Sequence, residues 1–206
     1  MIKIHDVEQY SEEWWALRKG RFTASLAKKL ITPTGKMSAQ CKEEVGRMIA
    51  EHMEWQEPDS VIETEWITRG SEMEDEARRW LEVVTDLPVD LIGIVTDEER
   101  PFSASPDGAL VNDEGLIPVE IKCPKPSTHI KWLLAGGLPD EHKAQVHFQM
   151  ALMGAPYAVF MSYNPDVEPL IVHVDADDYT DKLTHYMDKF VEQYRAAFNF
   201  IVEGDS

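Results

Sequence analysis

The sequence is poor in cysteine, has no long apolar run and carries few basic side chains. Its two cysteines, Cys41 and Cys123, are far apart and follow no zinc or redox spacing, which favours a reduced, intracellular compartment. The start lacks an apolar stretch of signal-peptide length, and no run of about eighteen apolar residues occurs, so we expect a cytoplasmic protein with no membrane partner. There is also no repeat and no Gly/Ser-rich linker. A length of 206 residues therefore predicts one domain, residues 1–206.

The deficit of basic residues bears on the partners that the protein can bind. Lys and Arg number 20 against 38 Asp and Glu, a net charge of −18. Taken alone, this charge argues against nucleic-acid binding, because affinity for the phosphate backbone comes largely from Lys and Arg. Net charge nevertheless describes solubility and long-range repulsion rather than the local field in a cleft. A DNA enzyme with this balance must gather its cations at one place and add positive charge from metal ions.

The predicted elements divide the chain into three parts. Residues 1–90 are mainly helical, with helices expected after Ser11, over 23–31, from Ser38 to about Trp55 and over 65–84. Residues 91–175 form a sheet core, with strands in 90–97, 101–111 and 115–123, then two glycine-closed helices and strands in 157–163 and 169–175. Residues 176–206 form a C-terminal helix, because apolar residues recur at steps of three and four. This order predicts an α/β (α+β) fold, with a central mixed β-sheet of about five strands flanked by helices.

Two carboxylates and a lysine lie in the sheet-forming part, in the segments "SPDG" (105–108) and "EIK" (120–122). Residues i and i+2 of a strand face the same side, so Glu120 and Lys122 are predicted to point together. If "NDEG" (112–115) turns the chain, Asp107, expected on the preceding strand, returns beside Glu120. With the Ile121 carbonyl, these carboxylates form a hard oxygen site suited to Mg²⁺. Lys122 would contact a metal-bound water or a scissile phosphate, which fits metal-assisted hydrolysis of a phosphodiester.

Each of these motifs also has a purely structural interpretation. An Asp-Gly pair is commonly just a turn. A Glu-x-Lys on a strand is often a solvated face with a cross-strand ion pair. Taken singly, each motif favours the structural interpretation, whereas both together, in this order and strand context, favour catalysis.

The pattern of Pro-Asp followed by Glu-x-Lys resembles the PD-(D/E)xK nuclease superfamily, which implies a restriction-endonuclease-like core. The surrounding segments narrow the resemblance to the phage λ exonuclease family, also called the YqaJ-type viral recombinases. The similarity spans residues 11 to about 163 and rests on five segments in the right order. These are "SEEWWALRKGRFTAS" (11–25), "RGSEMEDEAR" (69–78), "SPDG" (105–108), "EIKCP" (120–124) and "AQVHFQM" (144–150).

This resemblance implies a Mg²⁺-dependent 5′→3′ exonuclease. Such an enzyme digests one strand of linear double-stranded DNA to 5′-mononucleotides and leaves 3′ single-strand overhangs for recombination by strand annealing. It uses two Mg²⁺ ions per active site, for which Mn²⁺ is the expected substitute. The resemblance also implies a ring-shaped homotrimer, a single-strand annealing protein as partner, and a phage or prophage gene expressed in the cytoplasm of a bacterial host.

The family's metal site maps onto five residues of this sequence. Asp107 and Glu120 match the metal carboxylates, and Ile121 matches the residue whose backbone carbonyl completes the ligand set. Lys122 matches the lysine that orients or activates the attacking water. Glu74 matches a further acidic residue near the metals. On its own Glu74 would be dismissed, because a run of charges on a helix is usually a solvated face.

The family's 5′-phosphate pocket maps onto Arg18, Ser25, Ser105 and Gln145. A guanidinium binds a terminal phosphate bidentately, and hydroxyls or amides complete such a cradle. Ser105 lies two residues before Asp107, so we expect both on one strand face. Gln149 lies one helical turn beyond Gln145 and is a candidate extra contact. Without the resemblance, Ser25 would be a helix residue with a local backbone bond and Gln145 a surface amide.

Two other functions stay open at this point. The same fold serves endonucleases and flap nucleases that act in DNA repair or restriction. A non-catalytic DNA-binding module, in which the acidic residues are structural, is the second alternative.

Overall fold

The structure is a computed structural model that describes residues 1–54 and 65–204, with the backbone alone for residues 65–72. A four-stranded sheet has the order β1-β4-β5-β2, and a five-stranded sheet has the order β3-β6-β7-β8-β9. The first comprises β1 (Ile2–His5), β2 (Phe22–Thr23), β4 (Ile94–Asp97) and β5 (Phe102–Ala104). The second comprises β3 (Val89–Asp90), β6 (Gly108–Asn112), β7 (Gly115–Lys122), β8 (Tyr157–Asn164) and β9 (Val167–Asp175). The helices of the described residues are α1 (Glu12–Arg18), the 3₁₀ helix η1 (Ala24–Lys29), α2 (Cys41–His52), α3 (Glu65–Thr85), α4 (Pro126–Ala135), α5 (Asp140–Met153), α6 (Asp178–Phe198) and the π-helical turn η2 (Asn199–Glu203).

The predicted mixed α/β fold is confirmed, and the five-stranded sheet is its centre. Strands β7 and β8 run parallel, while the other pairs in this sheet are antiparallel. The parallel pair needs a crossover, which α4 and α5 supply, in keeping with the long connection that parallel strands require. The four-stranded sheet was not predicted. Its strands β1 and β2 are short and pair with β4 and β5, which lie far away in the sequence.

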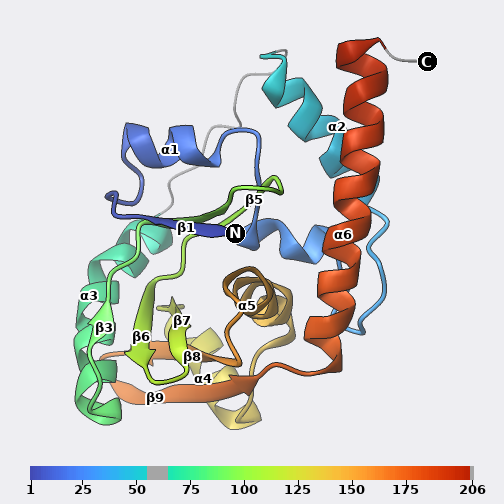
Figure 1. Ribbon diagram of the computed structural model, residues 1–206. Helices are drawn as coiled ribbons and strands as arrows, with labels where there is room; N and C mark the ends of the chain where they lie inside the picture. The colour runs from blue at the N-terminus through green and yellow to red at the C-terminus, as the bar shows by residue number, and fades with distance from the viewer. Residues whose placement is uncertain (55–64, 205–206) are drawn as a thin grey trace.

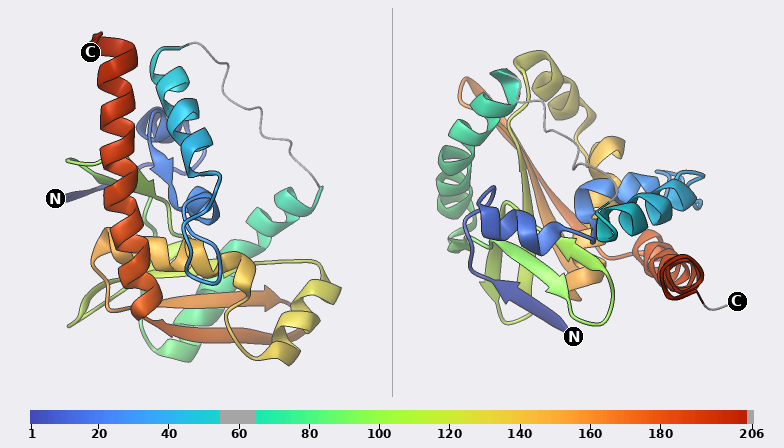
Figure 2. Two further views of the ribbon diagram at one scale, coloured as in Figure 1. Left: turned by 90° about the vertical axis from the view of Figure 1, so that its right-hand side faces the viewer. Right: turned by 90° about the horizontal axis from the view of Figure 1, so that it is seen from above.

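Helices cover both faces of the five-stranded sheet. On β8, the Phe160 ring packs against Trp132 of α4 and His142 of α5. Alternate residues of a strand face opposite sides, and on β8 the Tyr163 hydroxyl donates to Glu76 of α3 over 2.9 Å. Helix α3 therefore covers the other face, and Figure 1 shows it along the outside of the sheet. In both figures the long α6 runs beside α2, which it contacts (Figures 1 and 2). No helix among the described residues has the length and apolarity needed to cross a bilayer.

A cluster of phenylalanines joins the four-stranded sheet to α5 and to the C-terminal helix α6. Phe22 of β2 lies 6.2 Å from Phe102 of β5, 5.8 Å from Phe148 of α5 and 4.9 Å from Phe190 of α6, measured between ring centroids. All four rings are fully buried. The distances are those at which aromatic pairs attract beyond simple burial. This cluster fixes the N-terminal segment that carries η1 against α5.

The segment 101–111 is not one strand, contrary to the prediction. It divides into β5 and β6, and residues 105–107 connect them. Pro106 has no N–H to give to a ladder, and the Asp107 N–H donates to Val119 O over 3.0 Å at the start of the hairpin. The prediction that Ser105 and Asp107 share a strand face is therefore wrong.

Of the helices predicted in the N-terminal part, the one after Ser11 is confirmed and the one from Ser38 has different bounds. The short helix after Ser11 is confirmed, because the Ser11 hydroxyl accepts from the Trp14 N–H at 3.2 Å. Helix α2 begins at Cys41 rather than Ser38 and ends at His52, whereas Trp55, its predicted end, lies outside the described residues. Between α1 and η1 the chain turns at Gly20, whose φ of +71° favours glycine, and passes through β2.

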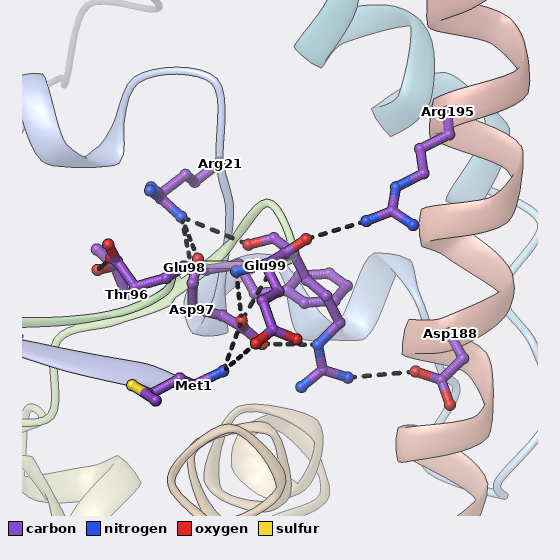
Figure 3. Close-up of polar contacts among 10 residues, drawn as sticks. Met1, Arg21, Thr96, Asp97, Glu98, Glu99, Asp188 and Arg195 are labelled. Carbon is purple, nitrogen blue, oxygen red and sulfur yellow. Dashed lines mark hydrogen bonds and ion pairs between the residues drawn. The ribbon is translucent and has the colours of Figure 1, made fainter.

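A polar cluster fixes the loop between β4 and β5 (Figure 3). The buried Asp97 carboxylate accepts from the backbone N–H of Glu99 at 2.9 Å and from Nε of Arg100 at 2.6 Å. Arg21 reaches the loop from the N-terminal segment and donates to Asp97 O over 2.8 Å. Arg195 of α6 donates to Glu99 O over 3.0 Å. The loop is thus held by two segments that are distant in the sequence, the one that carries Arg21 and helix α6.

Candidate active site

Three oxygen atoms meet at one positive charge at the C-terminal end of β7. The ammonium nitrogen of Lys122 lies 3.4 Å from Asp107 Oδ2 and 3.1 Å from the Ile121 carbonyl oxygen. It also contacts Glu120 Oε1 as an ion pair. The two carboxylates and the carbonyl predicted from the sequence therefore converge on a shared position.

Local backbone pairing places Asp107 there. The β6–β7 hairpin pairs Gly108 with Val119 in register, and a tight turn joins Asn112 to Gly115 as predicted. Asp107 precedes this ladder, and its Oδ2 accepts the Ile121 N–H over 2.7 Å. A backbone donor to a carboxylate is a strong, charge-assisted hydrogen bond. The aspartate is therefore fixed to β7, the strand that carries Glu120, Ile121 and Lys122.

Helix α5 holds the second carboxylate. Glu120 is only 1% exposed, and both of its oxygens are occupied. Gln145 Nε2 donates to Oε1 over 2.6 Å, and Gln149 Nε2 donates to Oε2 over 2.6 Å. These glutamines are four residues apart, so they lie one turn apart on the same side of the helix. Gln149 thus contacts Glu120, while its predicted contact with the phosphate pocket stays a prediction.

The site concentrates negative charge away from water. Burial raises the pKa of Glu120 to about 7, with Lys122 opposing and Asp107 adding to the shift. Burial also raises the pKa of Glu74 on α3 to about 7, and the charge of Asp107 adds to this shift. Although burial disfavours the charged lysine, Asp107 and Glu120 raise the pKa of Lys122 above its ordinary range. Such a group of carboxylates stays ionised only beside a cation.

The donor set fits a hard divalent ion. Carboxylate and carbonyl oxygens are the ligands that Mg²⁺ and Mn²⁺ prefer. Among residues 1–54 and 65–204, no three His, Cys, Asp or Glu side chains are close enough to hold a metal by themselves. A metal would therefore rely on Asp107, Glu120 and the Ile121 carbonyl. The Lys122 ammonium, in contact with all three, shows that they already surround one cation.

A second polar group connects α1, β2 and the segment before Asp107. The Arg18 guanidinium lies 4.2 Å above the Trp14 ring, and its Nη2 donates to Thr23 Oγ1 over 3.4 Å. Thr23 Oγ1 lies 2.9 Å from Ser25 Oγ. The Trp14 indole N–H donates to Ser105 Oγ over 2.8 Å. Three of the four predicted phosphate residues are therefore linked through Trp14 and Thr23.

The fourth, Gln145, lies across a pocket from Ser25. This pocket has a volume of about 220 Å³ and is lined by Ser25 and Lys28 of η1 and by Glu141, His142 and Gln145 of α5. Because Gln145 also donates to Glu120, the pocket borders the carboxylate site. The two groups predicted from the sequence thus form one continuous polar region.

Comparison with known proteins agrees with this geometry. A family model described as the YqaJ-like viral recombinase domain matches residues 13–156, more than half of the chain. The chain belongs to this family. The recombinase family predicted from the sequence motifs is thereby confirmed, and the matched range includes every residue assigned above to the two groups.

Solved structures with the same fold include several exonucleases. An alkaline exonuclease from Laribacter hongkongensis shares 26% identity with this YqaJ-like protein, with a TM-score of 0.78 over 94% of this chain and 97% of that chain. The structure of the same enzyme in complex with dAMP gives 24% identity and a TM-score of 0.71, over 95% of this chain and 100% of that chain. A phage-related exonuclease from Haemophilus somnus shares 14% identity with this chain. The TM-score is 0.61 over 88% of this chain and 96% of that chain, which shows a shared fold. Comparison with curated proteins gives no significant match.

Two residues of this YqaJ-like domain were missed in the sequence. The sequence motifs assign no site role to Trp14, yet its indole N–H contacts Ser105 and its ring contacts Arg18. Thr23 stands at the start of the helix predicted over 23–31, but its side chain makes no cap hydrogen bond and lies between Arg18 and Ser25 instead. The contact between Trp14 and Ser105 joins distant segments, for which spacing along the chain gives no signal, whereas the contacts of Thr23 with Arg18 and Ser25 are local.

Proposed function

We propose that this protein is a divalent-metal-dependent 5′→3′ exonuclease. In this proposal it digests one strand of linear double-stranded DNA to 5′-mononucleotides and leaves 3′ overhangs for recombination by strand annealing. Its family and its likeness to an alkaline exonuclease support a nuclease function. The observation that carries the proposal is the convergence of Asp107, Glu120 and the Ile121 carbonyl on one cation.

The proposed metal site takes up the excess negative charge. Asp107, Glu120 and the Ile121 carbonyl would hold Mg²⁺, or Mn²⁺ in its place, with Glu74 beside them and two ions per site. A bound ion of this kind lowers the pKa of water and neutralises charge on phosphate oxygens. Lys122 carries its proton in this arrangement, so it acts as a hydrogen-bond donor and a positive charge toward the attacked phosphate. Gln145 and Gln149 keep the Glu120 oxygens in place.

The second group supplies the preference for a 5′ end. Arg18 is partly buried and forms no ion pair with the described residues. Its guanidinium is therefore available to a phosphate, which a desolvated guanidinium binds strongly. A terminal phosphate carries more charge than an internal one, so a pocket formed by Arg18, Ser25, Ser105 and Gln145 favours chain ends. Its continuity with the carboxylate site would put the first phosphodiester bond beside the metals.

A strand-resolved digestion tests polarity and end dependence. The substrate is a linear duplex with a 5′ phosphate at one end, the other end being chemically blocked. We expect loss of the strand that begins with the free 5′ phosphate, release of mononucleotides, and slower digestion when that end carries a 5′ hydroxyl. Digestion from the 3′ end would contradict the proposed polarity. Nicking of closed circular DNA would contradict the end requirement and favour an endonuclease.

The family's assembly belongs to the same proposal. We infer a ring-shaped homotrimer that surrounds the duplex and delivers the overhang to a single-strand annealing protein. The mass of the protein in solution tests the first part, and a value for a monomer or dimer would contradict it.

A further inference from the structure

Tyr10 has an unusual backbone conformation at the edge of the active site. Its φ is +69°, in the left-handed region that bulky side chains rarely adopt. Its side chain is nevertheless displayed to solvent, with 64% of the residue exposed. A conformation of this kind persists only where the surroundings over-determine it, and such positions cluster at functional sites.

The residues on either side of Tyr10 impose this conformation. On one side, Gln9 Nε2 donates to the carbonyl of Pro106, the residue before Asp107, over 3.1 Å. On the other side, the Ser11 hydroxyl caps α1 by accepting the Trp14 N–H. Tyr10 must turn the chain between these two anchors.

Close backbone packing makes the anchor rigid. The segment before Tyr10 passes Gly93 so closely that a Cβ at this glycine would lie 2.1 Å from Val7 O. The Trp14 indole N–H also donates to Gly93 O over 3.1 Å. The loop therefore has little freedom to relax the backbone of Tyr10.

The Tyr10 ring packs beside Trp14 and lies within the field of the carboxylate site. Its centroid is 5.1 Å from that of Trp14, the ring that carries the Arg18 guanidinium on its face. Burial raises the pKa of Tyr10, and the charges of Glu74 and Asp107 raise it further. The phenol thus stays neutral and adds no negative charge beside a phosphate.

We propose that Tyr10 binds the nucleobase at the DNA terminus by stacking. The inference rests on the proposed function, because it places the terminal phosphate at Arg18 and the bond to be cleaved at Asp107. An exposed aromatic face next to a cationic pocket is the arrangement by which proteins bind single nucleotides without sequence preference, because every base has a π-face. The rigid anchor lets the ring meet the base without a further cost of ordering a loop.

Three substitutions separate stacking from backbone strain. Tyr10→Phe keeps the ring, Tyr10→Leu keeps an apolar side chain without it, and Tyr10→Gly removes the side chain while suiting the positive φ. Binding is measured with a duplex carrying 2-aminopurine as its 5′-terminal base, in Ca²⁺ so that the strand persists. The wild type and Tyr10→Phe should quench the 2-aminopurine fluorescence. Tyr10→Leu and Tyr10→Gly should lose most of the quench, and their Kd and KM should rise about tenfold with little change in kcat.

Asp86→Gly is the matched control. Asp86 also has a positive φ, +54°. It directly follows the C-terminal end of α3, about 18 Å along the helix axis from Glu74, and so lies away from the carboxylate site. This change should leave the quench, Kd and KM as in the wild type. Wild-type quench and KM in Tyr10→Leu would overturn the inference while leaving the exonuclease proposal intact, and an equal loss in Tyr10→Phe would overturn stacking. A wild type that binds the duplex but never digests it in Mg²⁺ would instead contradict the proposed function.

Discussion

Replacing Trp14 by phenylalanine is expected to weaken both the fold and the preference for a 5′ phosphate. Trp14 is buried, and its indole N–H is shared between Ser105 Oγ at 2.8 Å and Gly93 O at 3.1 Å. Phenylalanine keeps an aromatic face beneath Arg18 but removes this donor. Ser105 and the Gly93 carbonyl then lose a hydrogen-bond partner in a region that water reaches poorly.

The magnitude follows from the two hydrogen bonds. The two acceptors share one N–H, and leaving buried acceptors without it costs about 1–3 kcal/mol, so the free energy of unfolding should fall by about 2 kcal/mol. For a protein of this size, that lowers Tm by about 4–8 °C. Ser105 also loses the donor that orients its hydroxyl in the proposed phosphate pocket. We expect the ratio of kcat/KM for 5′-phosphate over 5′-hydroxyl ends to fall about tenfold, the equivalent of one charge-assisted hydrogen bond.

The assay compares two neighbouring tryptophans. Trp15→Phe makes the same chemical change on a ring that is 44% exposed and whose centroid is 5.9 Å from Arg18. Thermal unfolding and digestion of duplexes with either 5′ end are measured for both variants. Trp15→Phe should match the wild type in both measurements. The reasoning is refuted if Trp14→Phe keeps the wild-type end preference, or if both variants lose it equally.

Three further predictions concern charge. Burial opposes the ionised form of Asp97, but the backbone N–H groups at 99 and 100 and the Arg100 guanidinium lower the pKa of Asp97 below its ordinary value of 3.8. Its stabilisation is therefore present above pH 3.8 and is lost as pH falls through the lower pKa of the folded state, so Asp97→Asn should flatten the acid limb of Tm against pH. Without metal, ionisation of Glu74 lowers Tm as pH rises from 4.5 to about 7, because folded Glu74 holds its proton more tightly than the unfolded chain, whereas the lowered pKa values of His142 and His147 act in the opposite direction. The change of Tm across this range should therefore be more positive in Glu74→Gln, or in the wild type with Mg²⁺, than in the metal-free wild type, and identical profiles for the two metal-free proteins would contradict the charge assignment. Gln149→Leu removes a donor to Glu120 and should raise the Mg²⁺ concentration for half-maximal rate about tenfold, whereas an unchanged requirement would show that Gln149 does not position Glu120.

The sequence predicts the carboxylate site well because its geometry is local. Glu120 and Lys122 share a face through strand alternation, and the turn at 112–115 returns Asp107 to Glu120 within one hairpin. The five-stranded sheet follows from the same local patterns. The family motifs add Glu74, which its charged neighbours would otherwise hide.

The remaining features depend on pairing between distant segments. Strand β2 has two residues and exists only because it pairs with β5, about eighty positions away. The break at Pro106 divides what alternation alone describes as one strand. The contacts of Trp14 with Ser105 and of Gln149 with Glu120 likewise arise from packing, so no spacing along the chain predicts them.

One measurement tests the central claim most directly: the rate at which Asp107→Asn digests a 5′-phosphorylated linear duplex in Mg²⁺, compared with Asp113→Asn. Asp113 is an exposed residue of the β6–β7 turn, so the second variant makes the same change of charge on the same hairpin. We predict that Asp107→Asn loses activity by about 10²-fold or more while keeping the wild-type fold, and that Asp113→Asn digests normally. Wild-type digestion by a folded Asp107→Asn protein would contradict the metal-dependent nuclease account.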